Sequence, residues 1–368
     1  MNQHEWENLS TKKRYMPGID GLRAISVLAV VAYHFNMEWA QGGLLGVGVF
    51  FVLSGYLITD HILTEWKEKK EISILKFWIR RIRRLLPAMV WMLFVVALLL
   101  LITDPARLLA LKGDFLSSIF YVNNWYLIYN EVSYFESFGP ASPIGHLWSL
   151  SIEEQFYIVW PIVLLVSMKL APRRGQLIVL IFTLAFLSAI SMAVMYVPGT
   201  DPSRVYYGTD TRAFGILFGT ILAIVWPSWR MNDKVSLTAR TILDFLGTVA
   251  IFILIVLIYR TNEYDDLLYQ FGFVILSLVT VVVIAVLVHP ASRLGKIIGC
   301  RPLIWIGKRS YSLYLWHYPV IILTRPEANS NEAGFIQVLL QLIVIVILSS
   351  FSYKYVEEPI RRGNFWTR

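Results

Sequence analysis

The sequence has little charge and almost no cysteine. Only 16% of its 368 residues are charged, whereas soluble globular proteins average about 25%. Hydrophobic residues make up 57% of the chain and the mean hydropathy is +0.59, which excludes an ordinary soluble protein. Cys300 is the single cysteine, which excludes an intrachain disulfide and a multi-cysteine metal site. We expect no bound metal.

The sequence also lacks the alternation of apolar and polar residues that a membrane β-barrel requires. Its apolar residues instead form long runs, of the length that spans a bilayer as a helix. We therefore predict an all-α polytopic membrane bundle of about ten transmembrane helices, forming a single domain over 1–368. The predicted segments are 19–39, 44–63, 85–103, 147–168, 176–197, 211–229, 241–259, 268–289, 310–324 and 334–355.

The net charge of +8 comes from Lys and Arg residues that lie mostly between these runs. Alternate connections hold 26 of the 33 Lys and Arg residues, and the connections on the opposite side hold six. Because short cytoplasmic loops retain positive charge, we predict that both termini are cytoplasmic. Residues 1–18 then form a cytoplasmic tail, 64–84 a basic cytoplasmic loop and 104–146 an extracytoplasmic loop. These charges indicate contact with membrane lipids and not with nucleic acid.

The first predicted segment contains three ionisable residues, Asp20, Arg23 and His34. Arg23 and His34 are eleven positions apart, which corresponds to about three helical turns and puts both on one helix face about 16 Å apart. Ionisable residues within a membrane segment usually mark a site or a buried pair. Arg23 could instead extend to lipid headgroups, and His34 could be a hydrogen-bonded packing residue. A neutral, buried His34 could also accept a proton from a hydroxyl.

The predicted loop 64–84 contains eight Lys and Arg residues. This is more positive charge than a cytoplasmic loop needs to orient the protein in the membrane. Four of them form two pairs at helical spacing, Arg80 with Arg83 and Arg81 with Arg84. Each pair can present two guanidinium groups to one polyphosphate. The candidate ligands are anionic lipid headgroups or a multiply charged cytoplasmic cofactor.

The fourth predicted segment begins with a polar sequence over 146–157. His146, Ser149, Glu153 and Tyr157 follow the 3-4-4 spacing of one helix face, whereas Glu154 points elsewhere. Two carboxylates at this depth are unfavourable unless they are paired. We therefore expect at least one glutamate to face a polar interior and to pair with Arg or His.

Other polar residues lie in the second half of the chain. Tyr206, Asp210 and Arg212 are predicted to form a cluster at the outer end of the sixth segment, and His317 lies near the middle of the ninth. The predicted outer loop 104–146 is rich in aromatic residues. Two explanations fit this composition: an interfacial aromatic belt, or a platform on which sugar rings stack.

Taken together, these motifs resemble the acyltransferase-3 family of membrane O-acyltransferases, which modify extracytoplasmic glycans. Within that family the chain looks most like the transmembrane domain of bacterial peptidoglycan O-acetyltransferases. The resemblance extends in order from Asp20 to about Arg362. It rests on Asp20 to Arg23 with His34, on 48–58, 80–84, 146–157, 209–212 and 311–319, and on 357–359.

The resemblance implies a multi-pass protein of the bacterial cytoplasmic membrane that takes an acyl group from acyl-CoA, normally acetyl-CoA. Arg23 and His34 match the essential pair of the family, and Arg80 with Arg83 or Arg81 with Arg84 matches its RxxR motif. His34 would act as a general base or carry the acetyl group itself. Glu153 or Asp20 would orient the network.

The acceptor is less well defined by the resemblance. Peptidoglycan is the expected glycan, and another surface or exported polysaccharide is the alternative. The peptidoglycan enzymes commonly carry an additional SGNH-type domain, which this sequence does not contain. We therefore expect either a separate acceptor domain or a longer natural chain.

A solute transporter is a second hypothesis, although no internal repeat supports it.

Overall fold

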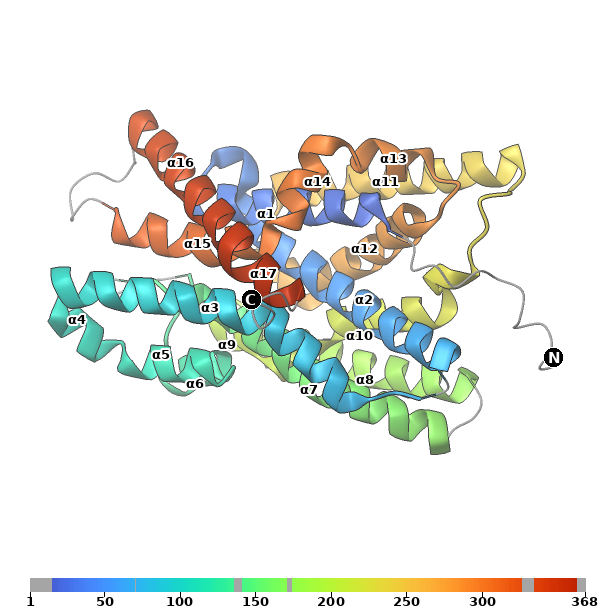
Figure 1. Ribbon diagram of the computed structural model, residues 1–368, viewed down its shortest axis with the longest axis horizontal. Coiled ribbons are helices and arrows are strands. Elements are labelled where there is room, and N and C mark those ends of the chain that lie inside the picture. The colour runs from blue at the N-terminus through green and yellow to red at the C-terminus, as the bar shows by residue number, and fades with distance from the viewer. Residues whose placement is uncertain (1–14, 70, 136–140, 171–173, 326–333, 363–368) are drawn as a thin grey trace.

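The computed structural model describes residues 15–69, 71–135, 141–170, 174–325 and 334–362, and every regular element in these ranges is a helix (Figure 1). The all-α prediction is therefore confirmed. Each of the ten predicted segments overlaps one long helix. These helices are α1 (Pro17–His34), α2 (Leu45–Lys69), α3 (Ile74–Thr103), α7 (Trp148–Leu170), α8 (Arg174–Met195), α10 (Thr209–Val225), α11 (Leu237–Arg260), α12 (Phe273–Val288), α15 (Ser310–Leu323) and α16 (Phe335–Phe351).

Shorter helices connect the long ones. They are η2 (Glu38–Leu44), α4 (Pro105–Ala110), α5 (Lys112–Ile119), α6 (Asn123–Tyr129), η3 (Gly145–Leu147), α9 (Ser203–Tyr207), η4 (Ser228–Arg230), η5 (Leu268–Gly272), α13 (Arg293–Ile298), α14 (Arg301–Lys308), η6 (Ser352–Glu357) and α17 (Glu358–Arg362). Within the described ranges, eight helical segments are long and apolar enough to cross a membrane. Neither α1 nor α15 is among them. The 14 residues of α15 extend about 21 Å, less than the thickness of about 30 Å of a hydrocarbon core.

Two predicted loops contain helices. The range 64–84 is not a basic loop in the structure, because α2 continues to Lys69 and α3 already begins at Ile74. The side chain of Ser73 starts α3 by accepting a hydrogen bond from the backbone N–H of Lys76, at 3.4 Å. The range 104–146 contains α4, α5, α6 and η3. Most of the predicted tail 1–18 lies outside the described residues.

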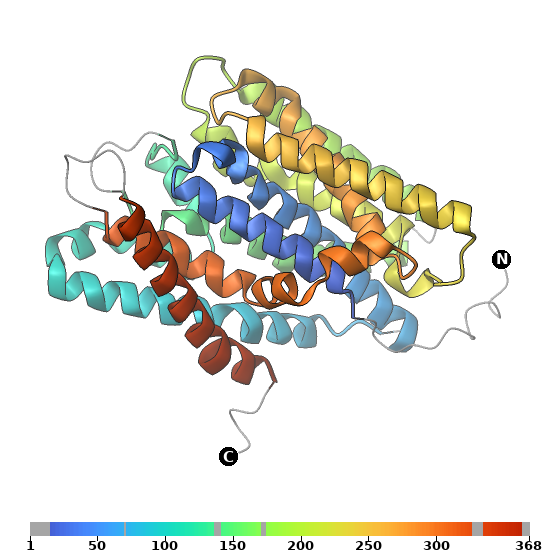
Figure 2. The ribbon, with the colours of Figure 1, turned by 90° about the horizontal axis from the view of Figure 1, so that it is seen from above.

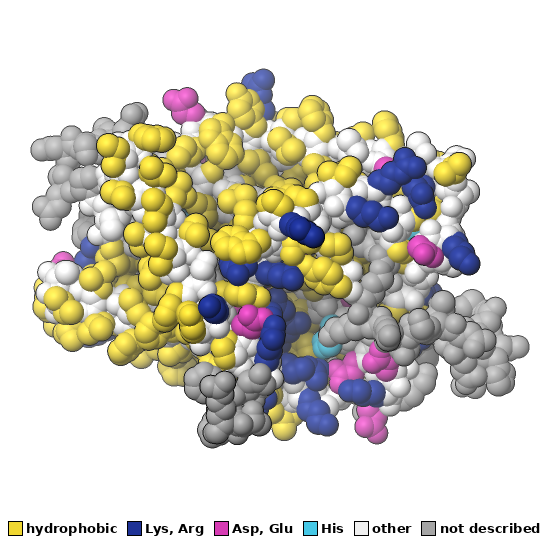
Figure 3. All heavy atoms as spheres, turned by 45° about the horizontal axis from the view of Figure 1, so that its top comes forward, with side chains coloured by type: hydrophobic (Ala, Val, Ile, Leu, Met, Phe, Trp, Pro, Cys, Tyr) yellow, Lys and Arg dark blue, Asp and Glu magenta, His cyan; other side chains and the backbone are white. Residues whose placement is uncertain are grey.

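Helix α1 lies at the centre of the bundle, where it packs against α2, α12, α14 and α15 (Figure 2). Its central position explains why a helix with ionisable residues is largely buried, although Leu28 remains exposed. The outer helices show the opposite pattern, with exposed apolar residues such as Phe94, Val194 and Ile336. On the face seen in Figure 3, hydrophobic side chains cover wide areas, and many of the Lys and Arg residues lie together toward the right. This is the surface expected of a protein that contacts lipid.

Helices α2 and α10 cross in close contact in the bundle core. A Cβ atom at Gly55 would lie 1.8 Å from the carbonyl oxygen of Ile216, and one at Gly219 would lie 2.0 Å from that of Val52. Both contacts are with backbone, which cannot move aside as a side chain can. Small residues therefore allow these two helices to approach each other, as in other membrane helix pairs.

We predict that Gly55→Ala destabilises the protein, because the added methyl group must push α10 away from α2. Overpacking of this kind typically costs about 1–3 kcal/mol. The measurement is thermal unfolding in detergent. Gly175→Ala is the matched control, since Gly175 is also helical and a Cβ atom there meets nothing within 4 Å. Equal melting temperatures for the two variants would contradict the packing argument.

Candidate functional site

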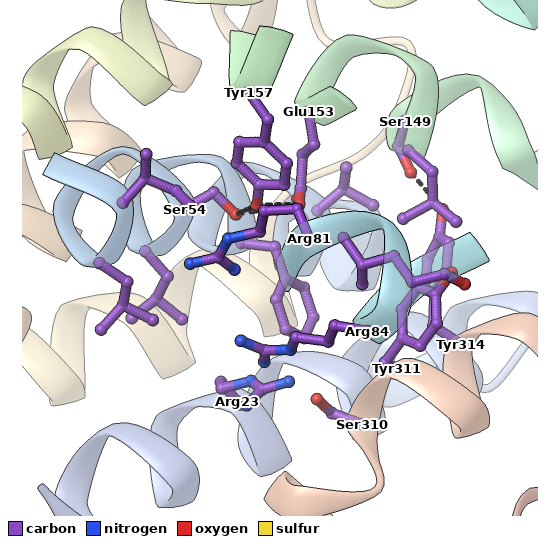
Figure 4. A pocket seen from close by; sticks show the side chains of 17 residues that line it. Arg23, Ser54, Arg81, Arg84, Ser149, Glu153, Tyr157, Ser310, Tyr311 and Tyr314 are labelled. Carbon is purple, nitrogen blue, oxygen red and sulfur yellow. Dashed lines mark hydrogen bonds between the residues drawn. The ribbon is translucent and has the colours of Figure 1, made fainter. Parts of the chain in front are cut away.

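A cavity of about 90 Å³ lies between α1, α2, α3, α7 and α15, and we call it the arginine cavity (Figure 4). Three guanidinium side chains extend into it, from Arg23 on α1 and from Arg81 and Arg84 on α3. Its other polar lining residues are Ser54, Ser149, Glu153, Tyr157, Ser310, Tyr311 and Tyr314. Much of the remaining lining is apolar, so the cavity combines a cationic part with a hydrophobic wall.

The structure distinguishes the two arginine pairs of α3. Arg81 and Arg84 line the arginine cavity, and within the described chain neither has a carboxylate within 4 Å. Arg80 instead forms an ion pair with Glu65 at 2.7 Å, and Arg83 is exposed. The side chains of Arg80 and Arg83 do not line this cavity. The pair available to an anion in the cavity is therefore Arg81 with Arg84.

The two carboxylates at or near this cavity have different partners. Glu153 accepts hydrogen bonds from Ser54 Oγ and from the Tyr157 hydroxyl, each at 2.9 Å. The expected pairing of this glutamate with Arg or His is therefore replaced by two hydroxyl donors, although Arg23 lines the same cavity. Asp20 forms the ion pair with Arg23, at 3.6 Å, and does not line the cavity itself.

A second and larger cavity, of about 570 Å³, lies beside the other end of α1, and we call it the histidine cavity. His34, the last residue of α1, lines it together with Tyr134 and Tyr318. Three acidic residues from connecting segments also line it, Asp114, Glu131 and Glu263. Burial raises the pKa of the Asp114 and Glu263 carboxyl groups above their usual values.

Hydrogen bonds determine which nitrogen of His34 is free to act as a base. Nδ1 of His34 lies 2.9 Å from the carbonyl oxygen of Val30 and 3.1 Å from Nε2 of His317. Nδ1 of His317 lies 2.7 Å from the carbonyl oxygen of Tyr314. Because carbonyl oxygens only accept hydrogen bonds, both neutral rings carry their proton on Nδ1. Nε2 of His34 then accepts a hydrogen bond from the Tyr134 hydroxyl, at 3.1 Å.

The two cavities are separated by about one helical turn. On α15, Tyr314 lines the arginine cavity, and Tyr318, four residues later, lines the histidine cavity. On the other side, Ser149 of α7 lines the arginine cavity, and Gly145 of η3 lines the histidine cavity. We call the layer between them the partition. Its thickness corresponds to a helical rise of about 5–6 Å.

The other predicted site residues lie in different places. His146 is buried against Tyr314 and His317, with ring centroids 5.3 and 5.5 Å away, and lines neither cavity. The spacing predicted that His146 lies on one helix face with Ser149, Glu153 and Tyr157. Those three residues line the arginine cavity, and His146 does not. Glu154 also lines neither cavity.

The predicted cluster of Tyr206, Asp210 and Arg212 is divided in the structure. Asp210 forms an ion pair with Arg204 at 2.8 Å, and both side chains are more than a third exposed. Arg212 is 2% exposed, and its guanidinium carbon lies 3.8 Å from the centre of the Phe273 ring. Tyr206 contacts Tyr134, with ring centroids 4.8 Å apart. The Arg212 guanidinium carbon also lies 5.1 Å from the centre of the Tyr206 ring, so these two predicted neighbours stay together, whereas Asp210 pairs with Arg204 instead.

Comparison with known proteins identifies the family. Residues 16–354 match the acyltransferase-3 family, which is described as an acyltransferase domain. The chain belongs to the acyltransferase-3 family. Three curated relatives that resemble it are the peptidoglycan O-acetyltransferase OatA of Listeria monocytogenes, 47% identical, the putative peptidoglycan O-acetyltransferase YrhL of Bacillus subtilis, 46% identical, and the O-acetyltransferase OatA of Staphylococcus aureus, 40% identical.

The matches to these acyltransferase-3 proteins cover 96% of this chain but only 57%, 56% and 58% of the relatives. The chain thus spans a little over half the length of the curated relatives it matches. No solved structure matches it. The sequence-based recognition of the family is confirmed by these comparisons.

The structure of this acyltransferase-3 protein adds Tyr134 to the candidate site. The sequence placed this tyrosine among many aromatic residues of 104–146, and no spacing connected it with His34. The two residues are 100 positions apart, so only the folded chain brings them together. In the part of the chain that the structure describes, no group of three or more His, Cys, Asp or Glu residues is arranged to hold a metal ion.

Proposed function

We propose that this chain transfers an acetyl group from acetyl-CoA in the arginine cavity to a hydroxyl group in the histidine cavity. One observation carries the proposal: a cationic cavity and a cavity lined by the half-buried imidazole of His34 lie end to end along α1, separated only by the partition. A donor with several negative charges suits the first cavity. Proton transfer from a hydroxyl suits the second.

The acceptor and the membrane orientation belong to the same proposal. The names of two relatives include peptidoglycan O-acetyltransferase, and we propose that acetyl groups delivered by this chain reach peptidoglycan. Positive charge in alternate connections supports an arrangement with both termini in the cytoplasm of a bacterium. Arg81 and Arg84 then face the cytoplasmic pool of CoA, and the histidine cavity opens toward the cell wall. The large histidine cavity also suits a bulky acceptor, such as a glycan strand or a separate domain that carries the acetyl group.

The charge and the lining of the arginine cavity suit parts of acetyl-CoA. Arg81 and Arg84 lack carboxylate partners in the described chain, so their guanidinium groups are available for phosphate oxygens. The apolar wall, which includes Leu53 and Leu57, suits the pantetheine arm. The arm is narrow and uncharged, and it can carry the thioester toward the partition while the phosphates stay with the arginines.

His34 supplies the base. Its Nε2 accepts the proton as the hydroxyl oxygen attacks the thioester carbonyl carbon. The carbon–sulfur bond then breaks, and the CoA sulfur leaves with the electron pair and takes up a proton. The hydroxyl that lies on Nε2 in this structure is that of Tyr134. The group that His34 activates is therefore this phenol, or an acceptor hydroxyl that takes its place.

We predict that Arg81→Gln with Arg84→Gln weakens CoA binding, because each arginine loses a charge-assisted contact with phosphate. Such contacts are worth about 1.5–3 kcal/mol, so the affinity should fall at least about tenfold. Calorimetry in detergent measures it. Arg80→Gln with Arg83→Gln is the matched control, since it removes the same charge from side chains outside the cavity. If the control weakened binding as much as the cavity pair, general attraction by the basic segment would explain the result.

We predict that His34→Ala lowers acetyl transfer by a factor of about 10² to 10⁴, the usual contribution of a general base. CoA binding should remain near wild type, because His34 lies in the other cavity. The assay follows CoA release from acetyl-CoA by protein in lipid nanodiscs, with a sugar oligomer as the hydroxyl acceptor. Turnover near that of the wild type would leave His34 only a packing role.

We predict that the two ends of the bundle face opposite compartments. After Cys300→Ser removes the exposed native thiol, Asn130→Cys should react with a membrane-impermeant maleimide in intact cells. Glu71→Cys should react only after the cells are permeabilised, because we propose that the turn between α2 and α3 faces the cytoplasm. Both positions are exposed in the structure. The reverse labelling pattern would contradict the orientation.

A further inference from the structure

The partition contains a hydrogen-bonded tyrosine that closes the route between the two cavities. The hydroxyl of Tyr314 lies 2.6 Å from Ser149 Oγ (Figure 4). The same hydroxyl lies 2.9 Å from the carbonyl oxygen of His146. These bonds connect α15 with the beginning of α7. Tyr314 and Ser149 are 7% and 3% exposed. The tyrosine ring therefore lies buried between the helices, at the end of the arginine cavity that is nearest to His34.

The neighbours of Tyr314 define the route. One turn further along α15, Tyr318 packs against His34 with ring centroids 4.9 Å apart and lines the histidine cavity. The ring of His317 lies 5.4 Å from that of Tyr314 and is fully buried. No residue lines both cavities among those described. An acyl group on a CoA arm in the arginine cavity therefore meets Tyr314 and Ser149 before it can approach His34.

We propose that Tyr314 determines acyl-group specificity, because its ring must move aside for an acyl group to reach His34 and the opening admits only a short chain. This inference rests on the proposed function, and it adds a selection step that neither the arginines nor His34 provides. The two hydrogen bonds hold the ring in the closed position. A bulky acyl chain would have to displace the buried ring further than an acetyl group does.

The test compares wild-type protein with Tyr314→Ala in nanodiscs, using acetyl-CoA and butyryl-CoA as donors and a sugar oligomer as acceptor. The measured quantity is the ratio of CoA release from butyryl-CoA to that from acetyl-CoA. Methylene groups in a restrictive pocket typically discriminate by at least about tenfold. Tyr314→Ala should therefore raise the ratio by about tenfold or more.

A second variant tests the same proposal if Tyr314→Ala does not fold. Ser149→Thr keeps the hydroxyl and adds one methyl group at the partition, so it should lower the ratio for propionyl-CoA relative to acetyl-CoA. Phe94→Ala is the matched control, since it also removes an aromatic ring, but Phe94 is exposed on the outside of the bundle and lines neither cavity, so both ratios should stay unchanged.

The outcomes separate this inference from the proposed function. If the wild type releases no CoA from acetyl-CoA, the proposed function is wrong and the selection step with it. If the wild type is active and the ratios do not change in the folded variants at Tyr314 and Ser149, only the role of Tyr314 is overturned. A change in Phe94→Ala as large as that in Tyr314→Ala would also overturn it, because the effect would then not depend on a ring at the partition.

Discussion

The hydrogen bond between His34 and His317 fixes the geometry on which the candidate site depends. It joins the end of α1 to α15 at 3.1 Å and directs the free nitrogen of His34 toward Tyr134. The bond needs no charge on either ring, which matters in a buried setting where an unpaired charge is unfavourable. His317 is held in turn by the carbonyl oxygen of Tyr314. The imidazole that we propose as the base is thus oriented by backbone and imidazole groups, and no carboxylate within the described ranges forms a hydrogen bond with it.

This arrangement also explains why α1 lies in the middle of the bundle. Its N-terminal half contributes Arg23 to one cavity, and its last residue contributes His34 to the other. A helix at the lipid boundary would expose these side chains to hydrocarbon. In the centre, Arg23 pairs with Asp20, and His34 bonds to Tyr134 and His317. The surrounding helices supply the lipid-facing surface instead.

The sequence was sufficient to predict the features that depend on residues close together in the chain. Apolar runs located the ten long helices, and the helical period brought Ser149, Glu153 and Tyr157 to one cavity. The period could not decide between the two arginine pairs, because the rotation of α3 about its axis is set by packing against its neighbours. It also could not predict the bond between His34 and His317, which are 283 positions apart. The predicted segment began at 85, whereas α3 begins at Ile74. The prediction relied on apolar runs, and charged residues interrupt the apolar run in the first turns of this helix.

The thinness of the partition has an electrical consequence. Where water enters both cavities, most of the voltage across a membrane falls over the layer that separates them. Moving one elementary charge through that layer involves about 2.3 kcal/mol at 100 mV. In the transfer that we propose, a neutral acetyl group crosses without this electrical work, whereas the charged phosphates stay beside Arg81 and Arg84. The proposed movement of the acetyl group is therefore insensitive to membrane potential, because only an uncharged end of the donor enters the partition.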